Sequence, residues 1–138
     1  MVIKVLSQYN ANPPRTLKAG SPRLIGSTKL YPNLLQQLDN YGVHPVTERT
    51  IEMMAIHKVD SGELRGWVQL ALQSGTYINS QWCTGNTPPG IYACDAYEVR
   101  GMLFCPKEQR EIMQDVYVKL CVAKSGATAA VISLHPSN

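Results

Sequence analysis

The stretch Asp115-Val-Tyr-Val-Lys-Leu-Cys-Val-Ala123, followed by Thr128-Ala-Ala-Val-Ile-Ser-Leu134, decides the fold class of this chain. In the first part, apolar residues alternate with more polar ones, which is the pattern of a strand with one buried face. The second part is rich in β-branched and small apolar residues, and Gly126 lies in the short segment between the two. The pair therefore predicts an antiparallel β-hairpin near the end of the chain.

The faces of these strands determine their register, because side chains that neighbour one another across a hairpin must share a face. A two-residue loop at Ser125-Gly126 would place Lys119 opposite Ile132 and mix the faces. A three-residue loop that also includes Ala127 keeps apolar residues opposite one another. We therefore expect the second register, with these pairs: Tyr117 with His135, Val118 with Leu134, Lys119 with Ser133, and Leu120 with Ile132.

Upstream of the hairpin, the periodicity changes from helical to strand-like at Gly75. The clearest helix is Ser61–Ser74, with Ser61 as its expected cap and Gly75 just past its end. The apolar face of this helix comprises Leu64, Trp67, Val68, Ala71 and Leu72.

Two more helices are predicted over residues 31–42 and 45–58, the latter with an apolar stripe of Ile51, Met54, Ala55 and Val59. Further strands are predicted over residues 76–82, 91–99 and 102–105, and a short helical turn over 106–113. The order of these elements predicts an α+β fold, in which N-terminal helices pack on one face of a small antiparallel β-sheet ending in a hairpin.

The length of 138 residues, with 44% hydrophobic and 17% charged residues, is typical of one globular domain. Proline and glycine interrupt the beginning of the chain, so we divide it into a basic, irregular segment (1–29) and a single α+β domain (30–138). No apolar run approaches the roughly 20 residues of a membrane-spanning helix. The apolar stretch at the start of the chain is too short to be the apolar part of a secretory signal. We expect a cytoplasmic protein, or a mature fragment whose targeting information lay elsewhere.

The net charge of +3 is concentrated near the beginning of the chain. Residues 1–38 contain five basic and no acidic residues, and the rest contains eight basic and ten acidic ones. A basic segment can neutralise phosphates or attract an acidic partner, so Arg15, Lys18 and Arg23 are candidate substrate-binding residues. The alternative is a solvated basic arm without a specific partner.

The cysteines do not predict a metal site. Cys83, Cys94, Cys105 and Cys121 form no C-x-x-C pair, whereas a structural zinc site usually has close ligand pairs. Cys121 falls within the apolar alternation and is expected to be a buried thiol. The spacing leaves a disulfide among the other three undecided.

The polar face of the hairpin carries residue types suited to cleaving RNA through its own 2′-hydroxyl group. That reaction needs a base for the hydroxyl proton, an acid for the leaving oxygen and cations for the phosphate. His135, Lys119 and Tyr117 could fill these roles, with Ser133 on the same face. The simpler interpretation is that this is the solvent side of a half-buried sheet.

A second group, His44 and Arg49, lies at the start of the predicted helix 45–58. The simpler interpretation of this group is a loop histidine followed by an exposed ion pair. His57, which lies off the apolar stripe of the same helix, is interpreted as a surface residue.

The arrangement of residues 44–135 resembles the superfamily that unites barnase, EndoU, ribonuclease colicins and RelE-type toxins (BECR). The helical half, 44–75, and the terminal hairpin Gln114-Asp-Val-Tyr-Val-Lys-Leu-Cys-Val122 with Ala130-Val-Ile-Ser-Leu-His135 carry the resemblance, and the hairpin is also similar to that of motility quorum-sensing regulator toxins. Residues 87–92 have no counterpart in these families. The resemblance implies a metal-independent ribonuclease toxin without a cofactor, acting on RNA in the bacterial cytoplasm, with a cognate antitoxin or immunity protein as partner. Its implied catalytic residues are Lys119, Tyr117, Ser133, His135, His44 and Arg49.

Two other classes of function compete with a ribonuclease. One is a non-enzymatic binding module, such as a phage, plasmid or immunity-type protein, that recognises a protein or nucleic acid through the sheet face or the basic segment. The other is a cysteine-based hydrolase or transferase, with Cys83 or Cys94 as nucleophile. Convergence of His135, Lys119 and a helix-borne His or Arg in one cleft would favour the enzyme over the binding module.

Overall fold

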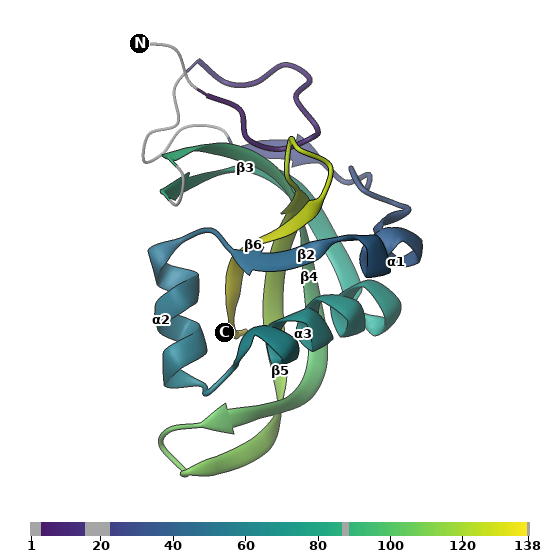
Figure 1. The fold of residues 1–138 in the computed structure, drawn as a ribbon. Helices are drawn as coiled ribbons and strands as arrows, with labels where there is room; N and C mark the ends of the chain where they lie inside the picture. Colours follow the sequence, from purple (N-terminus) through teal and green to yellow (C-terminus); the bar gives the residue numbers. More distant parts are fainter. Residues whose placement is uncertain (1–3, 16–22, 87–88, 138) are drawn as a thin grey trace.

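The computed structural model describes residues 4–15, 23–86 and 89–137 and is an α+β fold dominated by one β-sheet (Figure 1). Within these ranges, six strands form the sheet in the order β1-β3-β4-β5-β6-β2. The helical elements are α1 (Leu34–Gln37), the 3-10 helix η1 (Leu38–Asn40), α2 (Glu48–Ile56) and α3 (Ser61–Ser74). The strands are β1 (Leu24–Gly26), β2 (Gly42–Pro45), β3 (Thr76–Asn86), β4 (Pro89–Cys105), β5 (Arg110–Val122) and β6 (Thr128–Pro136).

The sheet is antiparallel except at one edge, where β2 runs parallel to β6. The prediction of an antiparallel sheet is therefore wrong for β2. This strand has only four residues, and its first and last residues, Gly42 and Pro45, are of types common in turns. Its pairing with β6 comes from the tertiary structure and not from a local alternating pattern.

The middle of the sheet is more continuous than predicted. The predicted strands 91–99 and 102–105 are parts of the single strand β4. The predicted helical turn at 106–113 is wrong, because a tight turn over residues 106–109 leads directly into β5. Gln109 adopts a left-handed φ of 55° in that turn. The long strands β3 and β4 curve strongly, which gives the sheet a concave side (Figure 1).

The predicted terminal hairpin is confirmed as β5 and β6, and the predicted register holds over half of its length. Tyr117 lies opposite His135 and Lys119 opposite Ser133. Beyond Lys119 the register shifts by one residue, so Leu120 pairs with Val131 and not with Ile132 as predicted. The extra residue on β6 is a β-bulge, which leaves Ile132 without a partner on β5.

Helix α3 is confirmed with the predicted bounds, although its cap is Asp60 and not Ser61. The Asp60 carboxylate accepts the backbone N–H of Glu63, and the Glu63 carboxylate accepts that of Asp60, which together form a capping box. The helix ends at Gly75 as predicted. Its predicted apolar face is buried at Leu64, Trp67, Val68 and Ala71, while Leu72 is half-buried.

Trp67 shows which side of the sheet α3 covers. A Cβ atom added to Gly101 of β4 would lie 2.7 Å from the Trp67 ring. The face of β4 on which that atom would lie is therefore the face covered by α3. Gly101 pairs with Gln114 on β5, five residues from Lys119. Because side chains alternate along a strand, Lys119 lies on the opposite, concave side of the sheet.

The predicted buried stripe of α2 is wrong except at Val59, which lies just past the helix and is buried. The buried residues of α2 itself are Thr50 and Met53, whereas Ile51 is 46% exposed and Met54 is only half-buried. The reason is that α2 lies beside the sheet edge, where it packs along β6 beyond the end of β2 (Figure 1). Its inward side therefore meets a strand edge with unpaired carbonyl groups, and a threonine hydroxyl group suits that surface better than an isoleucine.

The predicted helix 31–42 is shortened to α1 and η1 by a buried carboxylate. Asp95 of β4 is fully buried and accepts the backbone N–H groups of Leu30 at 3.0 Å and Tyr31 at 3.1 Å. It also accepts the Ser80 hydroxyl group at 2.6 Å. These bonds hold the chain before α1 in a non-helical conformation against the sheet, and Tyr41 leaves η1 as extended chain toward β2.

The N-terminal segment bonds across one end of the sheet, next to the β5–β6 turn (Figure 1). The backbone N–H of Leu6 donates to Ile91 at 2.9 Å, and that of Gln8 donates to Val122 at 2.7 Å. The Lys124 N–H donates to the Leu6 carbonyl group at 2.8 Å. Residues near the start of the chain are thus tied to both β4 and the terminal hairpin.

Candidate functional site

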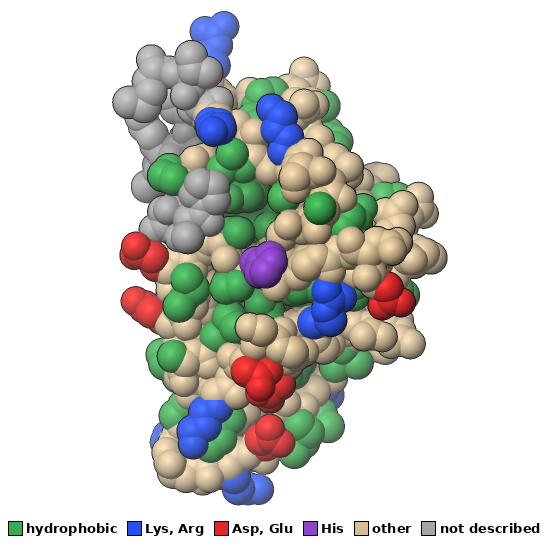
Figure 2. Space-filling view, in the orientation of Figure 1, with side chains coloured by type: hydrophobic (Ala, Val, Ile, Leu, Met, Phe, Trp, Pro, Cys, Tyr) green, Lys and Arg blue, Asp and Glu red, His purple; other side chains and the backbone are tan. Residues whose placement is uncertain are grey.

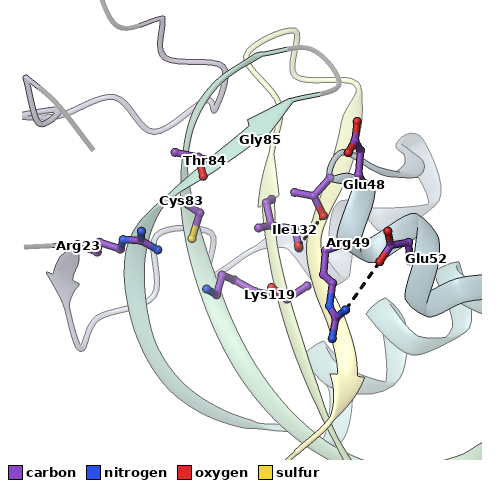
Figure 3. Close-up of a pocket in the computed structure, with 11 residues that line it drawn as sticks. Arg23, Glu48, Arg49, Glu52, Cys83, Thr84, Gly85, Lys119 and Ile132 are labelled. Carbon is purple, nitrogen blue, oxygen red and sulfur yellow. Dashed lines mark hydrogen bonds and ion pairs between the residues drawn. The ribbon is translucent and has the colours of Figure 1, made fainter. Parts of the chain in front are cut away.

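Lys119 lies at the centre of the concave side and reaches across two strands. Its neighbour on β4 is Ala96, whose small side chain leaves room for the lysine stem. The Lys119 ammonium group donates to Oε1 of Gln81 on β3 at 3.4 Å. The Cys83 thiol, also on β3, lies beside the same ammonium group (Figure 3). Lys119 is therefore half-buried by the curvature of the sheet.

An open cleft of about 580 Å³ surrounds this lysine (Figure 3). β3 forms one wall and the first turns of α2 form the other, while β5 and β6 supply the floor. The strong curvature of β3 brings these walls to face each other. The cleft is lined by Arg23, Thr47, Glu48, Arg49, Glu52, Cys83, Thr84, Gly85, Lys119, Ile132 and Ser133.

The β-bulge at Ile132 shapes the floor of the cleft. Because the bulge interrupts the alternation on β6, the consecutive residues Ile132 and Ser133 both line the cleft. The carbonyl group of Ile132 accepts the hydroxyl groups of Thr50 at 2.7 Å and Thr47 at 3.1 Å. Thr47 also caps α2 by accepting the Thr50 N–H at 3.0 Å. The start of α2 is thus fixed to the bulge beside Ser133.

The cleft contains three cationic and two anionic side chains. Arg49 forms an exposed ion pair with Glu52 at 3.7 Å. The pKa of Lys119 lies above its ordinary value, because the lowering by burial is outweighed by the combined effect of Cys83, Tyr117 and Cys94. Lys119 is therefore a cation throughout the neutral pH range, which makes it a charge partner and not a base.

Cys83 is unsuited to act as a nucleophile. A hydrogen bond with Cys94 and burial both raise the pKa of its thiol, with Lys119 opposing them weakly. The thiol therefore stays protonated at neutral pH, although only the thiolate is a strong nucleophile. Cys94 is completely buried, and burial raises its pKa as well. The geometry gives no support to the hypothesis of a cysteine-based enzyme.

Tyr117 and His135 form a stacked pair on the concave side, next to Lys119. Their ring centroids are 5.2 Å apart with an interplanar angle of 25°. The Lys119 Nζ atom lies 5.6 Å from the Tyr117 ring centroid. Burial raises the pKa of Tyr117, so its phenol keeps its proton at neutral pH.

The tautomer of His135 follows from its own hydrogen bond. Its Nδ1 atom lies 2.8 Å from the carbonyl oxygen of Pro136. A carbonyl group can only accept, so Nδ1 carries the hydrogen and donates it. In the neutral ring Nε2 then has the free lone pair and can take up a proton.

The residues predicted for the site are only partly brought together. Lys119, Ser133, Arg49 and the candidate substrate-binding residue Arg23 all line the cleft. Tyr117 and His135 are outside the cleft lining but adjoin it through Lys119.

The other predicted residues lie elsewhere. His44 is exposed on β2 and Arg15 is exposed in the N-terminal segment, and neither lines the cleft. Lys18 lies outside the described residues. His57, interpreted as a surface residue, is half-buried and bonds through Nδ1 to the Phe104 carbonyl group at 2.8 Å.

Several residues of the cleft were not predicted from the sequence. Thr84 and Gly85 come from β3, four strands along the sheet from β2, and face α2 only because the sheet curves. Cys83, which the sequence suggested only as a possible nucleophile, lines the cleft beside them. Glu48 and Glu52 of α2 also line the cleft, and the sequence did not single them out. No local pattern in the sequence identifies these positions, because their proximity depends on the tertiary structure.

The described part of the chain contains neither a candidate metal site nor a helix that could span a membrane. Within it, all four cysteines are free, and no three His, Cys, Asp or Glu side chains gather in a way that could hold a metal ion. None of the helices described in the structure combines the length and apolarity needed to cross a membrane.

Comparison with known proteins gave no relative: the sequence matches no family model, and no curated protein or solved structure is significantly similar to it. The resemblance to the BECR superfamily therefore stays a prediction from the sequence pattern.

Proposed function

We propose that this protein is a metal-independent endoribonuclease that binds a phosphate group of RNA at Lys119. The observation that supports this best is the position of Lys119, a half-buried cation on the floor of an open cleft, next to a tyrosine that stacks on His135. Phosphate oxygens are strong acceptors for such buried cations.

Arg23 and Arg49 reinforce the positive side of the cleft. They lie on opposite walls, so a phosphate group above Lys119 would lie between them (Figure 3). Arg49 already pairs with Glu52, but that ion pair is exposed and therefore weak. A phosphate group that accepts two hydrogen bonds from the Arg49 guanidinium group can compete with Glu52. The Ser133 hydroxyl group adds a neutral donor on the floor.

Figure 2 shows Lys and Arg side chains around the N-terminal segment and the β5–β6 turn, and others at the opposite end of the molecule, while acidic side chains lie over α2 and the start of α3. The basic side chains near the N-terminal segment can attract a polyanion to that end of the molecule.

In the proposed reaction, His135 Nε2 takes the proton of the ribose 2′-hydroxyl group, and the 2′-oxygen attacks the phosphorus atom. The bond from phosphorus to the 5′-oxygen breaks, and the leaving oxygen takes a proton from the Tyr117 phenol. Lys119 and the two arginines stabilise the charge on the pentacoordinate phosphate. The products are a 2′,3′-cyclic phosphate and a free 5′-hydroxyl group, so no external co-reactant is consumed.

A pair of lysine variants tests this proposal. Lys119→Met keeps the apolar stem but removes the charge, and we expect the cleavage rate to fall by roughly 10²–10³. Lys124→Met removes an exposed lysine at the β5–β6 turn, outside the cleft, and is the matched control. Equal activity of the two variants would contradict a role for the cleft.

The toxin setting belongs to the proposal as an extension drawn from the resemblance. It includes action in the bacterial cytoplasm and a cognate antitoxin or immunity protein. Expression in bacteria with and without the neighbouring open reading frame tests it, with growth arrest that the neighbour relieves as the expected outcome. Tight binding of a protein or RNA without any cleavage would instead support the alternative of a binding module.

A further inference from the structure

We propose that Gln81 is a positioning residue for Lys119. Its amide holds the Lys119 ammonium group in the cleft without neutralising it, and the side chain of Asn79 orients that amide. This inference deepens the proposed function, on which it rests for the phosphate group that Lys119 would bind. It gives a role to two residues of β3 that are outside the lining of the cleft.

The pairing of the strands brings the three side chains together. Asn79 of β3 and Lys119 of β5 both pair with Ala96 of β4, so they lie in one row across the sheet. Gln81 is two residues from Asn79 on the same strand, so its side chain lies on the same face. The small, fully buried Ala96 lets the lysine stem cross β4. The Lys119 ammonium group thereby reaches Gln81 and donates to Oε1 at 3.4 Å.

The orientation of the Gln81 amide follows from the donors and acceptors around it. A lysine ammonium group can only donate, so the oxygen of the Gln81 amide has to face Lys119. The amide nitrogen then points to Asn79, where Nε2 donates to Oδ1 at 2.9 Å. Turning the amide over would bring two donors together at Lys119 and two acceptors together at Asn79. Asn79 therefore fixes the orientation in which Gln81 accepts from Lys119.

Three neutral groups surround the Lys119 ammonium group. They are the Gln81 amide, the protonated Cys83 thiol and the ring of Tyr117, whose centroid is 5.6 Å from Nζ. Among the ion pairs of the described residues, none includes Lys119. A carboxylate at position 81 would cancel the charge and compete with a phosphate group. An amide supplies the acceptor and leaves the charge for the ligand.

The first test measures how well Lys119 is ordered, which does not depend on catalysis. The NMR signals of the Lys119 ε-methylene group are recorded in lysine-labelled protein and are assigned by their loss in Lys119→Met. Gln81→Met keeps the length of the side chain but lacks the amide oxygen, so we expect the two ε-proton signals to merge as the group becomes mobile. Gln81→Glu keeps an acceptor oxygen and should keep the two signals distinct. Unchanged signals in Gln81→Met, or equal behaviour of the two variants, would overturn the inference.

The role of Asn79 is tested by a double-mutant cycle with the same readout. Asn79→Leu acts on Lys119 only through Gln81, so it should alter the ε-methylene signals of the parent protein but not those of Gln81→Met. An effect of Asn79→Leu that persists in the Gln81→Met background would show that Asn79 does not act through the amide and would overturn this part of the inference.

The second test titrates the Gln81 variants with inorganic phosphate. Gln81→Glu should weaken phosphate binding by roughly 10-fold, because its carboxylate neutralises Lys119 and repels the anion. Gln81→Met should weaken it by only about 2- to 5-fold, the usual contribution of one hydrogen bond. Gln73→Glu and Gln73→Met, at an exposed position of α3, are the matched controls and should bind phosphate as the parent does. Equal losses in the two Gln81 variants would contradict the role of the neutral amide.

The two tests separate a failure of this inference from a failure of the proposed function. Thermal midpoints of all variants are compared with the parent, and a destabilised Gln81→Met is replaced by Gln81→Ala. If phosphate does not bind the parent protein while the NMR differences hold, the proposed phosphate site is wrong and the positioning of Lys119 stands. If the parent binds phosphate and cleaves RNA while the Gln81 variants leave the Lys119 signals unchanged, the positioning is wrong and the proposed function stands.

Discussion

The contact between Trp67 and Gly101 offers a quantitative test of how α3 packs on the sheet. Trp67 is 8% exposed, and a buried tryptophan removes roughly 200 Å² from water, which at about 25 cal/mol per Å² corresponds to roughly 4–5 kcal/mol. An alanine at this position would retain a small part of that burial energy, so Trp67→Ala should lower the free energy of unfolding by about 3–5 kcal/mol.

Gly101→Ala should destabilise the protein for the opposite reason. The added methyl group would lie 2.7 Å from Cη2 and 2.9 Å from Cζ3 of Trp67, which requires the packed ring to move. Overpacking of this kind costs roughly 1–3 kcal/mol. In the Trp67→Ala background the ring is absent and only the contact with Leu70 Cδ2 at 3.2 Å remains, so Gly101→Ala should cost much less.

The assay is urea denaturation of the parent, both single variants and the double variant. We expect a coupling energy of roughly 1–3 kcal/mol between the two positions, because the alanine at 101 fills part of the cavity left by the tryptophan. Gln69→Ala, exposed on the same helix, is the control and should change stability by less than about 0.5 kcal/mol. Costs that simply add would refute the contact.

Three further predictions concern buried polar groups. Asp95→Asn replaces an acceptor of backbone N–H groups with an amide that must place a donor against them, and should destabilise the protein by roughly 3 kcal/mol or more in urea denaturation; a change below about 1 kcal/mol would contradict the role of this carboxylate. Thr50→Val removes the hydroxyl bond to the Ile132 carbonyl group and should cost about 1–2 kcal/mol while Thr50→Ser restores most of it; equal stability of the two variants would show that the bond does not hold the bulge. Burial raises the pKa of Tyr92 from 10.0 to about 12, so the fold favours the neutral phenol. The resulting stability is complete below pH 10 and is lost as the pH rises toward 12, which a titration of phenolate absorbance alongside unfolding would detect, and Tyr92→Phe should reduce the alkaline loss.

The sequence was sufficient where structure depends on local patterns. The alternation in β5 identified the terminal hairpin and placed Tyr117 and Lys119 on the same side, because side chains on a strand alternate with a period of two. The run from Ser61 to Gly75 identified α3, because its helical period and its ending residue are both encoded locally.

The sequence was insufficient where distant segments determine the structure. β2 could not be predicted because its four residues form a strand only through parallel pairing with β6. The buried side of α2 was mispredicted because hydrophobic periodicity assumes an apolar neighbour, whereas Thr50 meets the carbonyl group of a β-bulge. The bulge itself leaves no local signal in the sequence.

The sequence likewise predicted one part of the candidate site and missed the other. The floor of the site, with Lys119 and Ser133, followed from the predicted register of the hairpin. Its walls did not, since Cys83 on β3 and Arg49 on α2 face each other only through the curvature of the sheet. His44, which the sequence placed beside Arg49, is instead exposed on β2.

Product analysis of RNA treated with the purified protein in the presence of EDTA tests the proposed function most directly. We predict cleavage that continues without divalent metal ions and leaves 2′,3′-cyclic phosphate and 5′-hydroxyl ends, because the substrate's own hydroxyl group attacks the phosphorus atom. A single 2′-deoxy substitution at the cut position should abolish cleavage there, and Lys119→Met should lower the rate by roughly 10²–10³ while Lys124→Met does not. Cleavage that EDTA stops, products with 5′-phosphate ends, or intact RNA at high protein concentration would contradict the account.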